Sequence, residues 1–219
     1  MRMTRAWTII IALLIVVVGG GIYFTSQVAE ERNGVPEEPV AEEEWALFTN
    51  EVYGFEFRYP AQWRTASSTE FEPIFNAYSP LPAGSAETPP FIHHHNVTNV
   101  SVFPMGVPTE GLFASSQPVN FPVGFPIAPG SMMFTLADGT PFAAYLVPVS
   151  RPQSWGEAGF VWIRARIEGA ETRCFSGEEE LSMEECDPLG TDHRIEWYGD
   201  VSAQEWNELL TVVRDMELR

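Results

Sequence analysis

The sequence predicts an α+β protein: an N-terminal transmembrane helix followed by a mainly antiparallel β-sheet domain with a C-terminal amphipathic helix packed on the sheet. Three observations predict this class. A long apolar stretch without charge lies near the start of the chain, short segments with alternating or apolar patterns fill the middle, and apolar residues recur at helical spacing near the end.

The apolar stretch predicts a membrane anchor over residues 7–28. No charged residue occurs between Ala6 and Ala29, and about 20 apolar residues suffice for a helix to cross the hydrocarbon core. Arg2 and Arg5 precede the stretch, so the positive-inside rule places residues 1–6 in the cytoplasm and the rest of the chain outside it. A cleaved signal peptide is the alternative, which the glycines at 19–21 leave open.

Residues 29–44 form an acidic flexible linker in this interpretation. They contain seven glutamates, two prolines and no aromatic residue, so they cannot bury enough apolar area to offset the entropy of ordering. The whole chain of 219 residues carries a formal charge of −18. A protein this acidic is repelled by phosphate backbones, which excludes nucleic acid as a partner class.

The extracytoplasmic domain covers residues 45–219 and begins with a predicted hairpin, 45–49 and 53–59. Within it, aromatic and charged residues alternate over 55–59, as in a strand with one buried face. Asp138-Gly139 indicates a hairpin turn. We expect further strands at 75–78, 96–103, 132–136, 142–149, 159–167 and 194–198.

The predicted C-terminal helix has the best-marked start in the chain. Ser202 and Glu205 have the spacing of a capping box, and Val201 and Trp206 that of a hydrophobic staple. The apolar positions that follow form one stripe suited to packing on a sheet. They are Trp206, Leu209, Leu210, Val213 and Met216.

The first hairpin resembles the start of membrane-anchored bacterial domains of the PsbP-like/Mog1-like group. The pattern is Tyr-Gly-Phe-x-Phe-x-Tyr-Pro-x-x-Trp, carried here by Tyr53, Gly54, Phe55, Phe57, Tyr59, Pro60 and Trp63. The end of the chain, a strand, a turn and an amphipathic helix, is also similar. The resemblance implies a fold, a PsbP-like α/β/α sandwich, and no active site.

Cys174 and Cys186 are the two cysteines of the chain. Two cysteines outside the cytoplasm most simply form a disulfide. On the chain-entropy model, closing a loop of this size adds about 3 kcal/mol of stability.

His93 and His95 are the candidate metal ligands. They flank His94, and in an extended strand they share one face. Two imidazoles on one face suit zinc or copper, but no third ligand is evident, and His193 is the one other histidine of the chain. The nucleophile, zinc-protease and phosphate-loop motifs are absent, so no catalytic residue and no cofactor is predicted.

Two hypotheses of function follow. The first is a non-enzymatic module that is attached to the lipid bilayer and binds or scaffolds another cell-envelope component. The second is a small metal-binding protein or metal-dependent enzyme that uses the His93–His95 cluster. The sequence does not predict the oligomeric state.

Overall fold

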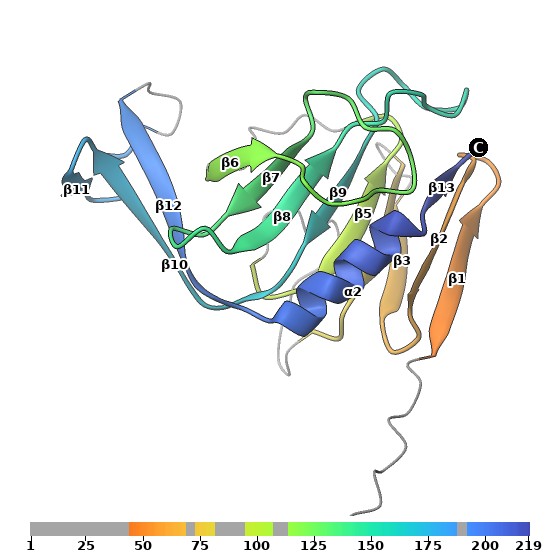
Figure 1. Ribbon diagram of the computed structural model, residues 1–219, viewed down its shortest axis with the longest axis horizontal. Coiled ribbons are helices and arrows are strands. Elements are labelled where there is room, and N and C mark those ends of the chain that lie inside the picture. The colour runs from red at the N-terminus through yellow and green to blue at the C-terminus, as the bar shows by residue number, and fades with distance from the viewer. Residues whose placement is uncertain (1–43, 69–72, 82–94, 107–113, 188–191) are drawn as a thin grey trace, which may run out of the picture. The chain divides into compact units, whose positions relative to one another are not determined.

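Antiparallel strands make up most of the structure, a computed structural model that describes residues 44–68, 73–81, 95–106, 114–187 and 192–219. Of these residues 49% are in strands and 8% in a helix. The strands form three sheets (Figure 1), and all of them belong to one compact unit, Glu43–Arg219.

The largest sheet has seven antiparallel strands and holds the centre of the molecule (Figure 1). Its first face packs against the helix and the first hairpin, around Val100, Val161 and Ile163. Its second face carries Phe103, Phe160 and other apolar side chains of a separate cluster. In spatial order the strands are β3 (Arg64–Ser68), β4 (Ile74–Tyr78), β5 (Asn99–Phe103), β9 (Phe160–Arg164), β8 (Pro141–Leu146), β7 (Met132–Thr135) and β6 (Ser115–Pro118).

The predicted first hairpin is present as β1 (Trp45–Asn50) and β2 (Phe55–Pro60), and β13 (Glu217–Leu218) adds a third strand beside β2. The alternation in β2 has the expected effect, since Phe55 and Phe57 are buried. Phe48 stacks on Phe57 with 5.2 Å between ring centroids. This aromatic cluster joins the hairpin to the core.

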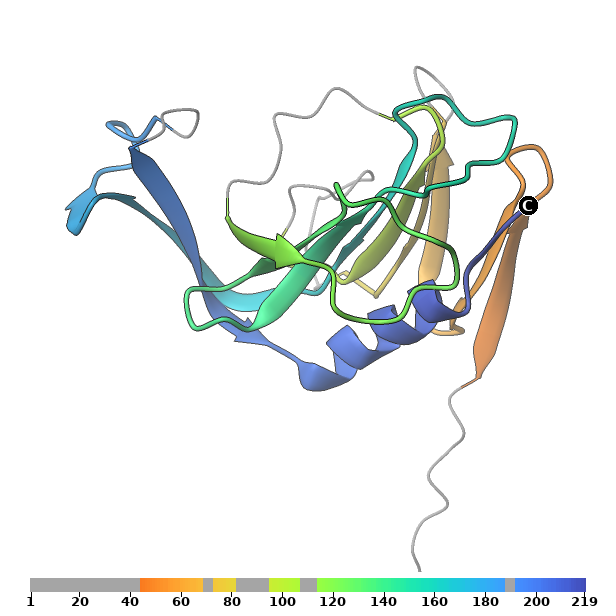
Figure 2. The same ribbon diagram turned by 45° about the horizontal axis from the view of Figure 1, so that its top comes forward.

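The helix α2 (Ala203–Arg214) lies across the first face of the large sheet (Figures 1 and 2). Ser202 caps it by accepting the N–H of Glu205 at 3.4 Å. The Glu205 carboxylate does not turn back to complete a capping box. It accepts the Thr98 hydroxyl and the Arg166 guanidinium, each at 2.6 Å, and so joins the helix to the sheet.

The third sheet is a ribbon that we call the arm: β10 (Ile167–Ser176), β11 (Glu179–Leu181) and β12 (His193–Val201). Figures 1 and 2 show the ribbon running away from the large sheet, starting from the end of β9. A bulge lies between Glu168 and Glu171. There Gly199 has φ +131°, and an added Cβ would lie 2.7 Å from Glu168 O, so this backbone contact requires glycine.

The predicted α+β class, with its α/β/α sandwich, is wrong. α2 is the single helix among the described residues. An α/β/α sandwich has a helical layer on each face of its sheet. Here the second face of the large sheet instead contacts the arm, through Trp197 and Val201. No helix in this part of the chain is long and apolar enough to cross a membrane. The stretch 7–28, predicted as a transmembrane helix, lies outside the described residues.

The strand predicted at 159–167 is also corrected. It is broken after Arg164, and a new strand starts at Ile167. Ala165 still faces the first cluster, whereas Ile167 packs in the second. The break changes which face each side chain takes and turns the chain out of the large sheet into the arm.

Candidate functional site

The histidine cluster predicted as a metal site is described only in part. His93 lies outside the described residues. The backbone carbonyl of His95 accepts the N–H of Ile167 at 2.7 Å, and its ring lies 6.4 Å from that of Trp197. His95 belongs to no group of three potential metal ligands in the described part of the chain. The His93–His95 metal site therefore stays a prediction.

The predicted disulfide between Cys174 and Cys186 is confirmed, with 6.0 Å between the two Cα atoms. Cys174 lies on β10 and is fully buried, and Cys186 is half-buried in the segment that leads from β11 toward β12. The bond therefore closes the distal end of the arm.

Three side chains with N–H groups occupy neighbouring positions on the second face of the large sheet, and we call them the donor cluster: Asn99, Trp162 and Arg164. Asn99 on β5 lies opposite Arg164 on β9, and Trp162 lies opposite Ser101 two residues further along the same face. Their side chains are buried, with exposures of 0%, 3% and 0%. Two central, adjacent strands thus place three N–H-bearing side chains inside a buried layer that also holds the polar side chains of Asn76 and Ser101.

The Asn99 amide lies beside a short chain of polar side chains on β5 and β4. Ser101 Oγ donates to Asn76 Oδ1 at 2.7 Å and lies 3.1 Å from Asn99 Oδ1. Asn76 Nδ2 in turn donates to the carbonyl of Ala66. With the Asn99 oxygen on the Ser101 side, its Nδ2 has no acceptor within reach among the described residues.

The Trp162 indole presents a second donor of this kind. Its ring packs against Phe134, with 5.6 Å between centroids. Its Nε1 is buried and has no hydrogen-bond acceptor within the described ranges. A buried donor left without an acceptor costs about 1–3 kcal/mol. Such a group in a folded protein therefore requires an explanation, of which a bound water, ion or ligand is one.

Arg164 supplies a positive charge beside these donors. Its guanidinium lies 5.0 Å from the centroid of the Trp197 ring and 5.5 Å from that of Phe142. Burial lowers the pKa of the Arg164 guanidinium to about 10, so the group remains protonated at neutral pH. A buried cation that lies over two neighbouring aromatic rings is stabilised by cation–π attraction and attracts negative charge.

The donor cluster can donate hydrogen bonds to a ligand, but its side chains do not exchange protons near pH 7. An indole N–H and an amide N–H do not titrate there, and Arg164 stays charged. The other side chains in the hydrophobic cluster on this face are apolar, with aromatic and aliphatic residues in similar number. This arrangement suits a ligand with an anionic or acceptor-rich head and an apolar body, and it offers no general base.

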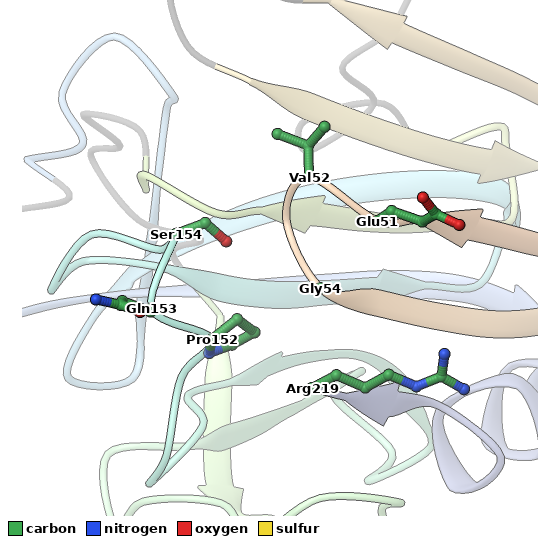
Figure 3. Close-up of a pocket in the computed structure, with 7 residues that line it drawn as sticks. All are labelled: Glu51, Val52, Gly54, Pro152, Gln153, Ser154 and Arg219. Carbon is green, nitrogen blue, oxygen red and sulfur yellow. The ribbon is translucent and has the colours of Figure 1, made fainter.

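A separate shallow depression of about 440 Å³ lies between the β1–β2 turn and the loop at 152–154 (Figure 3). It has two charged lining residues, Glu51 and Arg219, and Arg219 already pairs with Glu56 and Glu217. In Figure 3 the side chain of Gln153 points away from those of Glu51 and Arg219, so no polar groups converge on one point. The depression is therefore a weaker candidate than the donor cluster.

Reasoning from the sequence did not identify Asn99, Trp162 or Arg164. One signal was present: Arg164 interrupts the most apolar of the predicted strands. From the alternation of apolar and polar residues alone, such a residue is predicted to face away from the core. It becomes a site residue only when both faces of the strand are buried, as in β9.

Comparisons with protein-family models, with curated proteins and with solved structures found no match for this chain. The resemblance of the first hairpin to PsbP-like/Mog1-like domains therefore stays a prediction at the level of family.

Proposed function

We propose that this protein is a non-enzymatic binding module of the cell envelope, whose donor cluster holds the anionic head of an amphipathic ligand. The observation that carries the proposal is the pair of buried donors, Asn99 Nδ2 and Trp162 Nε1, beside the cation of Arg164. A negative head group supplies the acceptors that these donors require. Carboxylate and phosphate groups match a guanidinium in both charge and geometry.

The location is part of the same proposal. The apolar stretch 7–28 attaches the chain to the bilayer, and the domain stands on the extracytoplasmic side. The disulfide supports this side, because disulfides persist in oxidising compartments. The ligand is then a component of the envelope, where amphipathic acids are abundant.

A ligand at the donor cluster is enclosed, because all three side chains are buried. We therefore expect it to remain bound during purification. Mass spectrometry of the full chain under native conditions, followed by analysis of what denaturation releases, should find an acidic amphiphile in a 1:1 complex. Release of no such molecule from a protein freshly isolated from its own membrane contradicts the proposal.

Direct binding provides the second test. Dodecanoate is the probe, dodecanol is its uncharged control, and the full chain is stripped of ligand and kept in a neutral detergent. Trp162→Phe removes the donor and keeps an aromatic ring. A hydrogen bond to a charged group contributes about 1.5–3 kcal/mol, so dodecanoate affinity should fall by about 10- to 150-fold.

Trp155→Phe is the matched control variant. Trp155 is also buried, but its Nε1 donates to the carbonyl of Tyr53 at 2.7 Å on the other face of the large sheet. Its replacement should leave dodecanoate affinity unchanged. Equal binding of dodecanoate and dodecanol, or equal losses in the two variants, refutes recognition of an anionic head by the donor cluster.

A further inference from the structure

A histidine lies beside the disulfide at the distal end of the arm. Ligand atoms of Cys174, Cys186 and His193 all lie within 4.8 Å of one another. The three residues come from β10, the segment after β11, and the start of β12. The antiparallel register, in which Ser176 pairs with His193, brings them together from separate parts of the sequence.

The imidazole of His193 is held in a defined tautomer. The backbone N–H of Asp187 donates to His193 Nδ1 at 2.8 Å. Nδ1 is therefore the unprotonated nitrogen, and its lone pair faces the segment that carries Cys186. A metal ion bound to Nδ1 would replace this hydrogen bond, with no change of tautomer.

The spacing of the three ligand atoms suits a tetrahedral ion. Zinc bound to thiolate and imidazole at about 2.3 Å and 2.0–2.1 Å separates its ligand atoms by roughly 3.5–3.8 Å. Once the sulfur–sulfur bond is broken, each ligand atom needs to move by only about 1 Å. Cys186 is half-buried outside the regular strands, so its segment can make this adjustment.

The charge of the arm favours a cation. Residues 167–201 contain eleven acids against two arginines, a net charge of −9 and half of the −18 carried by the chain. Glu185 and Asp187 flank Cys186 directly, and Glu184 precedes Glu185. A concentration of negative charge raises the local concentration of divalent cations.

We propose that reduction of the Cys174–Cys186 disulfide converts the end of the arm into a zinc site with Cys174, Cys186 and His193 as ligands. A dithiol reductant attacks the more accessible sulfur, that of Cys186, and Cys174 leaves as a thiolate. The second thiol of the reductant then releases Cys186, so that the cystine gains two electrons and two protons and the dithiol becomes a disulfide. Zinc binding releases the two thiol protons.

The test uses the full chain, reduced with a phosphine that is then removed under anaerobic conditions. Co²⁺ is the probe, because a cobalt–thiolate bond gives a charge-transfer absorption that histidine-only binding lacks. We expect one Co²⁺ per reduced chain with this absorption, displacement of the Co²⁺ by Zn²⁺, and no such absorption from the disulfide form.

Two variants make the test specific. His193→Ala should lower Co²⁺ affinity at least about 10-fold, whereas His95→Ala, which removes a histidine away from this cluster, should not change the thiolate absorption. A reduced wild-type chain without thiolate–cobalt absorption, folded or unfolded, overturns the proposal. Equal cobalt affinity in reduced wild type and His193→Ala overturns the assignment of the third ligand.

Discussion

Replacing Trp162 and, separately, Trp155 by Phe compares two buried indoles that differ in one respect. Trp155 Nε1 donates to Tyr53 O at 2.7 Å, whereas Trp162 Nε1 has no acceptor in the described part of the chain. Both side chains are buried, at 8% and 3% exposure, and both variants lose the same part of the ring. Comparing the two variants therefore tests whether the indole N–H of Trp162 has an acceptor.

The expected difference in stability follows from these contacts. Loss of part of a buried indole costs roughly 1–2 kcal/mol in packing in either variant. Trp155→Phe also loses a hydrogen bond, which adds about 0.5–1.5 kcal/mol. Trp162→Phe instead removes a buried donor whose penalty is about 1–3 kcal/mol. Trp155→Phe should therefore lower the free energy of unfolding by about 3 kcal/mol more than Trp162→Phe.

Chemical denaturation of the ligand-stripped protein measures this difference, and thermal melts give a second value. A gap of about 3 kcal/mol corresponds to roughly 6–12 °C in Tm for a chain of this size. If Trp162→Phe destabilises the stripped protein as much as Trp155→Phe does, then the Trp162 indole N–H is paired in solution. The donor cluster is then part of the structural core and not a ligand site.

Three further changes test the fold around this site. Glu205→Gln weakens the charged hydrogen bonds that join α2 to the large sheet, and unfolding titrations should show a loss of about 1.5–3 kcal/mol. Gly124→Ala places a methyl group 2.6 Å from the carbonyl oxygen of Arg214, and the same titration should show a loss of about 1–3 kcal/mol. The Tyr198 hydroxyl holds the pKa of Glu196 below 4.5, so Glu196→Gln should reduce the loss of stability as the pH falls below 4.5.

Specific outcomes contradict each of these expectations. If Glu205→Gln leaves the free energy of unfolding unchanged, α2 is held on the sheet by apolar packing alone. A stable Gly124→Ala variant means that the loop does not approach the C-terminal end of α2 as closely as described. For Glu196, the lowered pKa in the folded state gives stability that is present above pH 4.5 and lost below it. If Glu196→Gln and the wild type lose the same stability as the pH falls, the pairing of Glu196 with Tyr198 is contradicted.

The elements with strong local signals could be predicted from the sequence. The first hairpin, the Asp138-Gly139 turn and the Ser202 cap depend on residues close together in the chain, and all three are present. The disulfide was predicted from cysteine number and compartment. In each case the physical cause acts over a few residues or, for the disulfide, needs no knowledge of the fold.

The arm and the donor cluster could not be predicted in this way. The arm is rich in glutamate, and its strands are stabilised by contacts along and across the ribbon, such as Arg194 with Glu196 on the same strand and the Arg173 guanidinium over Tyr198 on the opposite strand. These contacts do not produce a periodic pattern of apolar residues in the sequence. Arg164 and Asn99 become neighbours through strand register alone, since 65 positions separate them, and no local pattern encodes that register.

The pairing of β13 with β2 places a constraint on how this domain is made. Arg219 and Glu56, which are 163 positions apart, form one of the contacts at this strand pair. During synthesis at about 5–20 residues per second, the first hairpin waits roughly 10–30 seconds for its third strand and for the cover of α2. Its aromatic face, with Phe48, Phe55 and Phe57, stays unprotected during that interval. A chain of this topology is thus most exposed to aggregation before its last residues are in place, and helper proteins that shield aromatic surfaces would act at that stage.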